Sequence, residues 1–477
     1  MSLKKQAIKG TIWAYIQQFS TQIFTFIITI ILARLISPEE FGLIGMITIF
    51  IALGTAFFDG GLINSLIVND AIDEQDYSTV FFFNIFIAIT IFFVLFFTSP
   101  YIAAFYDKPI LTSLIRVYSL VFIFNSLGTI QNVILTKEMN FKKITFINLP
   151  ALIISSILSI IMAYKGFGVW SLVFSYVLNS FFSSLFLWII VKWKPMFIFN
   201  LVAFKIHFNF GYKLMLSNVL DIVYRNSYNV IIGKYFSAFQ VGLYTNANSL
   251  IMLPIGNISG AINRVALPMF SVIKDDNKKL KEAYKRIIEL VFFIVLPIMM
   301  LIFVLAEEII LFFFTEKWLN MTEILRILSL SAIFYPIHYY NLLILQIKGK
   351  TGSYLKLEVI KKIIQTIIII FSVFFGFKAL LWGQVIFSVL ALFVNTFYTS
   401  SILKYSMINQ IIDVTPLFII TALIGVLCFY LNYSFDLNSI FLIILLFSSF
   451  GISMYFCVTY FFKISSFFEL KKILKYK

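Results

Sequence analysis

The chain has 477 residues, of which 61% are hydrophobic and only 12% are charged, and its formal net charge is +15. So few charged residues cannot cover several water-soluble domains of ordinary size, which excludes a soluble multidomain protein and makes lipid the solvent for most of the surface. Cys428 and Cys457 both fall inside apolar segments, so a disulfide framework is not expected either.

Apolar runs of about 20 residues, the length that crosses a bilayer as a helix, recur along the chain. We expect fourteen such helices, at about 11–34, 41–67, 79–99, 111–136, 146–164, 168–191, 211–233, 241–268, 288–311, 322–347, 357–376, 379–402, 415–433 and 437–461. The first run continues far past a signal-peptide core and meets Arg34, so we predict an uncleaved first helix. The predicted fold class is therefore an all-α integral membrane protein.

Residues 31–44 are repeated 200 positions later at 231–244, between two apolar segments in each copy. The matched pairs are Arg34 and Lys234, Ser37 and Ser237, Glu40 and Gln240, and Gly42 and Gly242. Each serine, with the Glu or Gln three residues later, predicts a capping box at a helix start. Residues 111–120 match 321–330 in the same way, at an offset of 210.

This duplication predicts two parallel six-helix repeats that form two lobes around a central cavity, followed by two additional helices. We assign 1–200 to the N-terminal lobe, 201–402 to the C-terminal lobe, and 403–477 to the added helices and a basic tail. Of the 37 basic residues, 27 fall in loops and tails on one side of the predicted topology and six on the other. The positive-inside rule then places both termini in the cytoplasm.

Because the positive charge follows the topology, it predicts attraction to anionic membrane lipids rather than binding of nucleic acid. Polar residues inside the spans recur at steps of three and four, so that each set shares one helix face. Such a stripe either bonds to neighbouring helices or lines a wet cavity. The candidate cavity-lining residues are Gln18, Gln22, Thr25, Asn125, Asn132, Ser217, Tyr224, Asn246 and His338.

Four of the six arginines in the chain, Arg116, Arg225, Arg264 and Arg326, fall within predicted spans. Guanidinium stays charged and presents a planar fork to phosphate, so these arginines are candidates for binding an anionic headgroup. Arg116 and Arg326 lie near the outer ends of their helices, where snorkelling to the lipid headgroups is an equal alternative.

Two aspartates also fall within spans. Asp221 lies one helical turn from Arg225 and is either its counter-charge or a group in energy coupling. Asp59 is either a counter-charge for Arg264 or a protonatable group in energy coupling.

Signatures of enzymes are missing from the sequence. It has no phosphate-cradling loop, no nucleophile elbow and no metal-ligand motif, so we expect neither catalysis nor a cofactor or metal. Glu39 and Glu40 could imitate the acidic residues of a membrane glycosyltransferase, but helix capping explains Glu40 more simply.

The segment Leu32-Ala-Arg-Leu-Ile-Ser-Pro-Glu-Glu-Phe-Gly42, followed by Phe58-Asp-Gly-Gly-Leu62, closely resembles the bacterial polysaccharide transporters of the Wzx type. Their superfamily also holds exporters of the MATE type and lipid II flippases. The resemblance implies a flippase of the bacterial cytoplasmic membrane that moves an undecaprenyl-pyrophosphate-linked oligosaccharide by alternating access. Lipid II flippases carry a functional arginine on the eighth helix, where Arg264 lies in this chain.

By this resemblance the partners are the lipid-linked oligosaccharide and membrane lipids, with a polysaccharide polymerase and export machinery as further candidates. Two other functions stay open from the sequence. One is a cation-coupled exporter of small molecules, and the other is a membrane glycosyltransferase or polysaccharide polymerase.

Overall fold

A computed structural model describes residues 3–69, 72–434 and 439–475. All regular secondary structure in these ranges is helical, which confirms the predicted all-α class. The first residues of the last predicted span, 437–438, and Lys477 of the basic tail lie outside the described residues. The chain forms two compact units, Met1–Gly242 and Leu243–Lys477.

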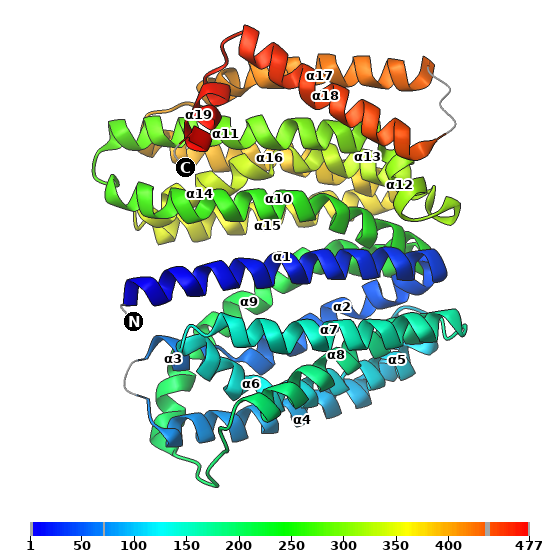
Figure 1. Cartoon of the computed structure of the whole chain (residues 1–477), viewed down its shortest axis with the longest axis vertical. Helices are drawn as coiled ribbons and strands as arrows, with labels where there is room; N and C mark the ends of the chain where they lie inside the picture. Colours follow the sequence, from blue (N-terminus) through cyan, green and yellow to red (C-terminus); the bar gives the residue numbers. More distant parts are fainter. Residues whose placement is uncertain (1–2, 70–71, 435–438, 476–477) are drawn as a thin grey trace. The chain divides into compact units, whose positions relative to one another are not determined.

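In unit 1, α1 packs along α7, α7 and α6 pack on α8, and α4 packs on α5 and α6 (Figure 1). Helix α9 packs on α2, α3 and α4 and completes the unit. The bounds are α1 (Leu3–Leu35), α2 (Pro38–Asp59), α3 (Leu62–Val68), α4 (Glu74–Phe105), α5 (Ile110–Tyr118), α6 (Leu120–Lys137), α7 (Phe141–Tyr164), α8 (Val169–Ile190) and α9 (Leu201–Tyr235). Helix α10 (Ala238–Val272) begins in unit 1 and continues into unit 2.

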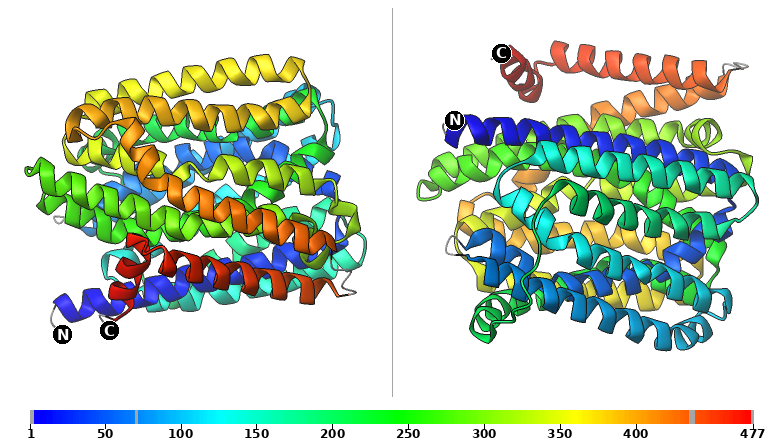
Figure 2. Two further views of the ribbon diagram at one scale, coloured as in Figure 1. Left: turned by 90° about the horizontal axis from the view of Figure 1, so that it is seen from above. Right: turned by 60° about the horizontal axis from the view of Figure 1, so that its bottom comes forward.

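In unit 2, α11 packs on α13, α14 and α17, and α16 packs on α13, α14 and α15. The added helices α17 and α18 pack on each other, and the short α19 leaves α18 at a steep angle and packs on α11 (Figure 2). The bounds are α11 (Asn277–Val304), α12 (Ala306–Phe313), a 3-10 turn (Glu316–Trp318), α13 (Met321–Ala332), α14 (Tyr335–Ile347), α15 (Thr351–Phe374), α16 (Phe377–Leu403), α17 (Met407–Ser434), α18 (Ile440–Phe461) and α19 (Ser465–Lys475).

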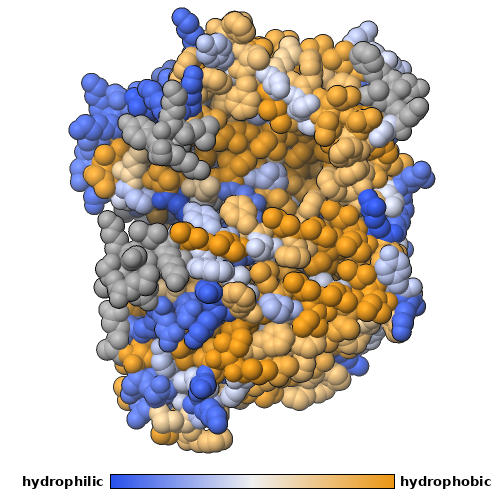
Figure 3. Space-filling model, viewed as in Figure 1, coloured by the Kyte–Doolittle hydropathy of each residue, from blue (hydrophilic) through white to orange (hydrophobic). Residues whose placement is uncertain are grey.

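Twelve helical segments in the described ranges are long and apolar enough to cross a membrane, against the fourteen that the sequence predicts. The two predicted spans missing from this set lie in α9 and α15, which form helices of 35 and 24 residues. Charged residues interrupt both helices, for example Asp221 and Arg225 in α9 and Lys361 in α15. In each unit, hydrophobic residues cover most of the helix lengths and hydrophilic residues gather near helix ends (Figure 3).

In both predicted capping boxes the serine hydroxyl accepts a hydrogen bond from the backbone N–H three residues later. The hydroxyl of Ser37 accepts a bond from the backbone N–H of Glu40, and Glu40 accepts one from the backbone N–H of Ser37 at 3.0 Å. In the second copy the backbone N–H of Gln240 donates to the hydroxyl of Ser237 at 3.2 Å. Glu40 also accepts a bond from the backbone N–H of Val169 at 3.1 Å, so one carboxylate caps the starts of α2 and α8. Such groups satisfy donors that a helix start leaves unpaired.

The starts of α2 and α10 cross with their backbones in contact. A Cβ added at Gly42 would lie 1.6 Å from the carbonyl oxygen of Ala238, and one added at Gly242 would lie 1.9 Å from that of Pro38. These two contacts are equivalent under the repeat, since 38 + 200 is 238 and 42 + 200 is 242. The duplicated segments therefore meet about a local pseudo-two-fold axis, and only glycine fits at the crossing.

We expect Gly42→Ala to destabilise the protein by about 1–3 kcal/mol, because the new methyl group displaces a backbone carbonyl that cannot rotate away. Gly256→Ala, on α10, is the matched control, since a Cβ at Gly256 meets nothing within 4 Å. That control gains helix propensity and is expected to be neutral or slightly stabilising. The measurement is the apparent melting temperature of each purified variant. A Gly42→Ala protein as stable as the control would contradict the close backbone contact between α2 and α10.

Candidate functional site

The second membrane-crossing segment is broken inside unit 1. Helix α2 ends at Asp59, and α3 starts at Leu62 after two glycines with left-handed backbone, Gly60 (φ 48°) and Gly61 (φ 70°). Glycine adopts this conformation without steric cost. Non-helical backbone at membrane depth is tolerated only where it packs against protein or lines a water-filled cavity. We therefore expect the break either to pack against protein or to line a water-filled cavity.

Helix α9 covers one side of the break. A Cβ at Gly61 would lie 2.4 Å from the Cα of Gly211, and a Cβ at Gly211 would lie 2.3 Å from the carbonyl oxygen of Gly60. One turn away on α9, His207 is buried and its Nδ1 lies 2.8 Å from the hydroxyl of Ser65 on α3. Its Nε2 lies 3.2 Å from a carboxylate oxygen of Asp76 on α4. These contacts join α3, α4 and α9 beside the break.

On another side of the break lies a polar cavity of about 580 Å³, lined by residues of α1, α2, α3, α6, α7 and α8. Most of its wall consists of amide and hydroxyl side chains, and one residue carries a charge. The polar lining residues are Gln17, Thr21, Asp59, Asn125, Thr129, Asn132, Thr136, Asn148, Asn179, Ser183 and Ser184. The cavity is large enough for several water molecules, and its wall offers the polar partners that such water requires.

Of the described residues in this wall, Asp59 alone is ionisable. Among the described residues its carboxylate has no hydrogen-bond or ion-pair partner, although the hydroxyl of Ser183 donates to the amide oxygen of Asn148 at 3.0 Å. The side-chain amides of Asn125 and Asn132 are also without hydrogen bonds in the described ranges. A single carboxylate among neutral oxygens can hold a proton or one monovalent cation. No group of three or more His, Cys, Asp or Glu able to hold a metal ion occurs in those ranges.

The structure brings three of the predicted site residues together, since Asp59, Asn125 and Asn132 all line this cavity. The predicted first-helix residues Gln18, Gln22 and Thr25 do not line it. Their neighbours Gln17 and Thr21 line it instead, which is a shift of one position along α1. Asn148, Asn179 and Ser183 were not predicted, although α7 contributes one polar residue to the cavity and α8 contributes three. The spacing of four between Asn179 and Ser183 was the available signal.

The four predicted arginines have different surroundings. Arg225 pairs with Asp221 at 3.3 Å, and the two side chains are 77% and 57% exposed. Arg264 lies on α10 and is exposed. Arg116 and Arg326 occupy equivalent positions in the repeat, and each donates its Nε–H to a carbonyl oxygen of a neighbouring helix, that of Phe96 at 3.2 Å or that of Phe303 at 3.3 Å.

The remaining predicted lining residues lie outside the unit 1 cavity. Ser217 is exposed on α9 and Tyr224 is half-buried on the same helix. In unit 2, Asn246 is buried on α10, and His338 on α14 has its Nδ1 2.9 Å from the amide nitrogen of Asn395 on α16.

Comparison with known proteins identifies what this arrangement resembles. Residues 31–323 match a family described as "Polysaccharide biosynthesis protein". The teichuronic acid biosynthesis protein TuaB of Bacillus subtilis (strain 168) is 24% identical over 436 residues, which cover 91% of this chain and 90% of TuaB.

Solved structures share the fold. The lipid II flippase MurJ in an inward closed conformation superposes with a TM-score of 0.74 at 18% identity, over 95% of this chain and 99% of MurJ. An inward-facing multidrug resistance transporter of the MATE family superposes with a TM-score of 0.62 at 18% identity, over 80% of this chain and 95% of that one. The chain therefore shares its fold with MurJ and with this MATE transporter.

A wet cavity has a direct test by cysteine accessibility. In a chain with Cys428 and Cys457 replaced by Ser, Asn132→Cys is expected to react with a small water-soluble thiosulfonate at least about tenfold faster than Ile130→Cys, because only a solvated thiol forms the reactive thiolate. Both residues lie on α6, but Ile130 is fully buried. Equal, slow labelling of the two positions would mean that the cavity is dry.

Proposed function

The chain belongs to this polysaccharide biosynthesis family, and from that membership we propose that it translocates undecaprenyl-pyrophosphate-linked oligosaccharide units across the bacterial cytoplasmic membrane. The observation that carries the proposal is the family match over residues 31–323. The full-length similarity to a teichuronic acid biosynthesis protein supports a surface glycan as the cargo. Such a unit combines a polar sugar headgroup and a diphosphate, neither of which crosses hydrocarbon unaided.

The proposed mechanism is alternating access between the repeats 1–200 and 201–402, with both termini in the cytoplasm. The fold shared with a flippase and an exporter supports movement of a substrate rather than its chemical conversion. The basic loops and tail support the orientation, since positively charged loops remain on the cytoplasmic side. A polymerase and an export apparatus are the proposed downstream partners.

In this proposal Arg225 and Arg264 bind the diphosphate. Both are exposed within their own units, and guanidinium offers two parallel donors to a phosphate. The pair between Arg225 and Asp221 is an exposed i,i+4 pair, which is worth only about 0.3–0.5 kcal/mol, so an incoming phosphate can replace the aspartate. Arg116 and Arg326 have a smaller role, because each already donates to a backbone carbonyl.

We assign Asp59 to energy coupling rather than to pairing with Arg264. Among the described residues that line its cavity no other is ionisable, so the polar groups of this lining around the carboxylate are neutral amides and hydroxyls. A carboxylate in that setting gains a proton or a cation more easily than one beside an arginine. Its position at the end of α2, directly before the glycine break, lets a change of charge act on the angle between α2 and α3.

Two other functions are less well supported. A membrane glycosyltransferase that uses Glu39 and Glu40 would need free carboxylates, but Glu39 pairs with Lys108 at 2.8 Å and Glu40 caps two helices. A cation-coupled exporter of small molecules has the same fold and would also use Asp59. The exporter alternative predicts sensitivity to toxic cations on deletion, whereas a glycan flippase predicts loss of surface polysaccharide.

We expect Arg264→Gln to lower the rate of glycan export by about 10- to 100-fold, because a bond to a charged group contributes about 1.5–3 kcal/mol. Lipid-linked units should then accumulate facing the cytoplasm while protein abundance stays normal. Arg286→Gln is the matched control, since Arg286 pairs with Glu469 at 3.5 Å on the surface of unit 2. Normal export by the Arg264→Gln protein, or equal loss in the control, contradicts the role of Arg264.

For Asp59 we expect that Asp59→Asn abolishes the dependence of transport on a proton or cation gradient, since the amide cannot change its charge. Asp59→Glu keeps the carboxylate and should retain part of the gradient-driven rate. Transport by each variant is measured in cells or vesicles with and without an ionophore. If Asp59→Asn responds to the ionophore as the unchanged protein does, coupling occurs elsewhere.

A further inference from the structure

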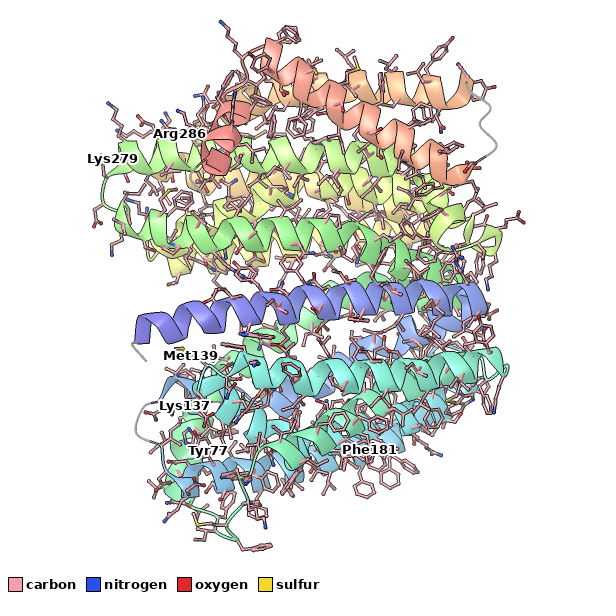
Figure 4. All side chains as sticks on the ribbon, viewed as in Figure 1. Tyr77, Lys137, Met139, Phe181, Lys279 and Arg286 are labelled. Atoms are coloured by element: carbon pink, nitrogen blue, oxygen red, sulfur yellow. The ribbon has the colours of Figure 1, made fainter. Side chains whose placement is uncertain are left out.

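A second pocket lies at one end of unit 1. It has a volume of about 860 Å³ and is formed where α4 and α7 begin and α6 and α8 end. Its lining residues are Glu74, Tyr77, Ile134, Leu135, Lys137, Glu138, Lys143, Ile190, Val191, Lys192, Trp193 and Lys194. Figure 4 labels Tyr77, Lys137 and the neighbouring Met139 at this end of the unit. The lysine distribution assigns this end to the cytoplasm.

The pocket favours an anion. Four lysines against two glutamates leave two positive charges in excess (4 − 2). Two helix starts and two helix ends meet here, so their opposite partial charges of about half a unit each cancel. One glutamate is already engaged, since Glu74 accepts a hydrogen bond from the indole of Trp193 at 2.7 Å.

Three of the lysines are available to a ligand. The side chains of Lys143, Lys192 and Lys194 have no hydrogen bond, ion pair or ring contact within the described residues. Lys137 is fixed, because its ammonium group donates to the carbonyl oxygen of Asn69 at 2.7 Å. The wall behind them is also fixed, with the ring of Trp193 5.5 Å from Phe81 in an edge-on contact. The pocket therefore has a fixed wall, with the ammonium groups of Lys143, Lys192 and Lys194 around it.

The segment that follows the pocket in the chain indicates how deep in the membrane the pocket lies. Phe197 is 94% exposed, and Met196, Ile198, Phe199, Leu201 and Val202 are exposed as well. The backbone of this segment is nevertheless held, since the N–H groups of Met196 and Asn200 donate to the hydroxyls of Ser78 and Thr79, both at 3.0 Å. A fixed segment with so many exposed apolar side chains is stable only in lipid, and the lysines beside it then lie among the lipid headgroups.

We propose that this pocket binds the phosphate of an anionic phospholipid, such as phosphatidylglycerol, at the cytoplasmic surface. Lys143, Lys192 and Lys194 contact the phosphate as point charges, and the acyl chains extend along the exposed apolar segment. A zwitterionic lipid binds less well, because the positive charge in its own headgroup is repelled by the excess lysines of the pocket. The site belongs to the membrane environment of the protein and does not depend on the proposed cargo.

The test compares matched double variants of the full chain, each purified and transferred to phosphatidylcholine nanodiscs. Phosphatidylglycerol is then titrated in, and bound lipid is counted by native mass spectrometry. Lys143→Ala with Lys192→Ala removes two pocket lysines. Lys142→Ala with Lys278→Ala removes two lysines outside the pocket, since the ammonium of Lys142 lies 5.6 Å from the ring of Trp13.

We expect the pocket variant to bind phosphatidylglycerol about 25-fold more weakly, given about fivefold for each of the two lysines near an anionic surface. The control should bind as the unchanged protein does, and Lys143→Arg with Lys192→Arg should retain binding, which separates loss of charge from misfolding. Equal binding by the pocket variant and the control overturns the proposal. Displacement of the lipid by soluble glycerol phosphate at equal concentration also overturns it, because the site would then be one for free anions.

Discussion

Hydrocarbon forms no hydrogen bonds with peptide groups, so the interruption of α2 at Asp59-Gly60-Gly61 must be satisfied by protein or by water. Unit 1 meets this requirement on both sides. Gly211 of α9 packs against the break on one side, and the polar cavity opens beside Asp59 on the other. The carboxylate, the glycines and the amide-rich wall thus lie together in unit 1, at the end of the candidate membrane span Pro38–Asp59.

The same constraint explains which features could be predicted from the sequence. Membrane crossing and the repeat follow from local patterns, because helix length, capping boxes and the equivalent residues Gly42 and Gly242 are all written in short segments. The sequence predicts fourteen spans, whereas twelve described helices are long and apolar enough to cross a membrane. The other two predicted spans lie in α9 and α15, which carry charged residues. Helix periodicity alone cannot tell a charged crossing helix from one that lies elsewhere.

Site prediction was less complete for a geometric reason. A polar stripe gives the residues that share a helix face, but the direction of that face depends on how neighbouring helices pack. Gln18 and Gln22 on α1 stay a prediction for a cavity between the repeats, whereas Gln17 and Thr21, one position away, line the cavity inside unit 1. Arg116 and Arg326 show the same limit, because a bond from a guanidinium to a carbonyl of a neighbouring helix leaves no trace in the sequence around it.

The central claim is that this chain moves a lipid-linked glycan across a bilayer. The most direct measurement reconstitutes the purified protein into sealed vesicles that contain a fluorescent undecaprenyl-pyrophosphate-linked oligosaccharide, and follows how much of it becomes protected from an added glycan-cleaving enzyme. If the chain is a flippase, the protected fraction changes much faster than in protein-free vesicles, and the rate responds to an imposed ion gradient. Protection that stays at the protein-free rate under every gradient would contradict it.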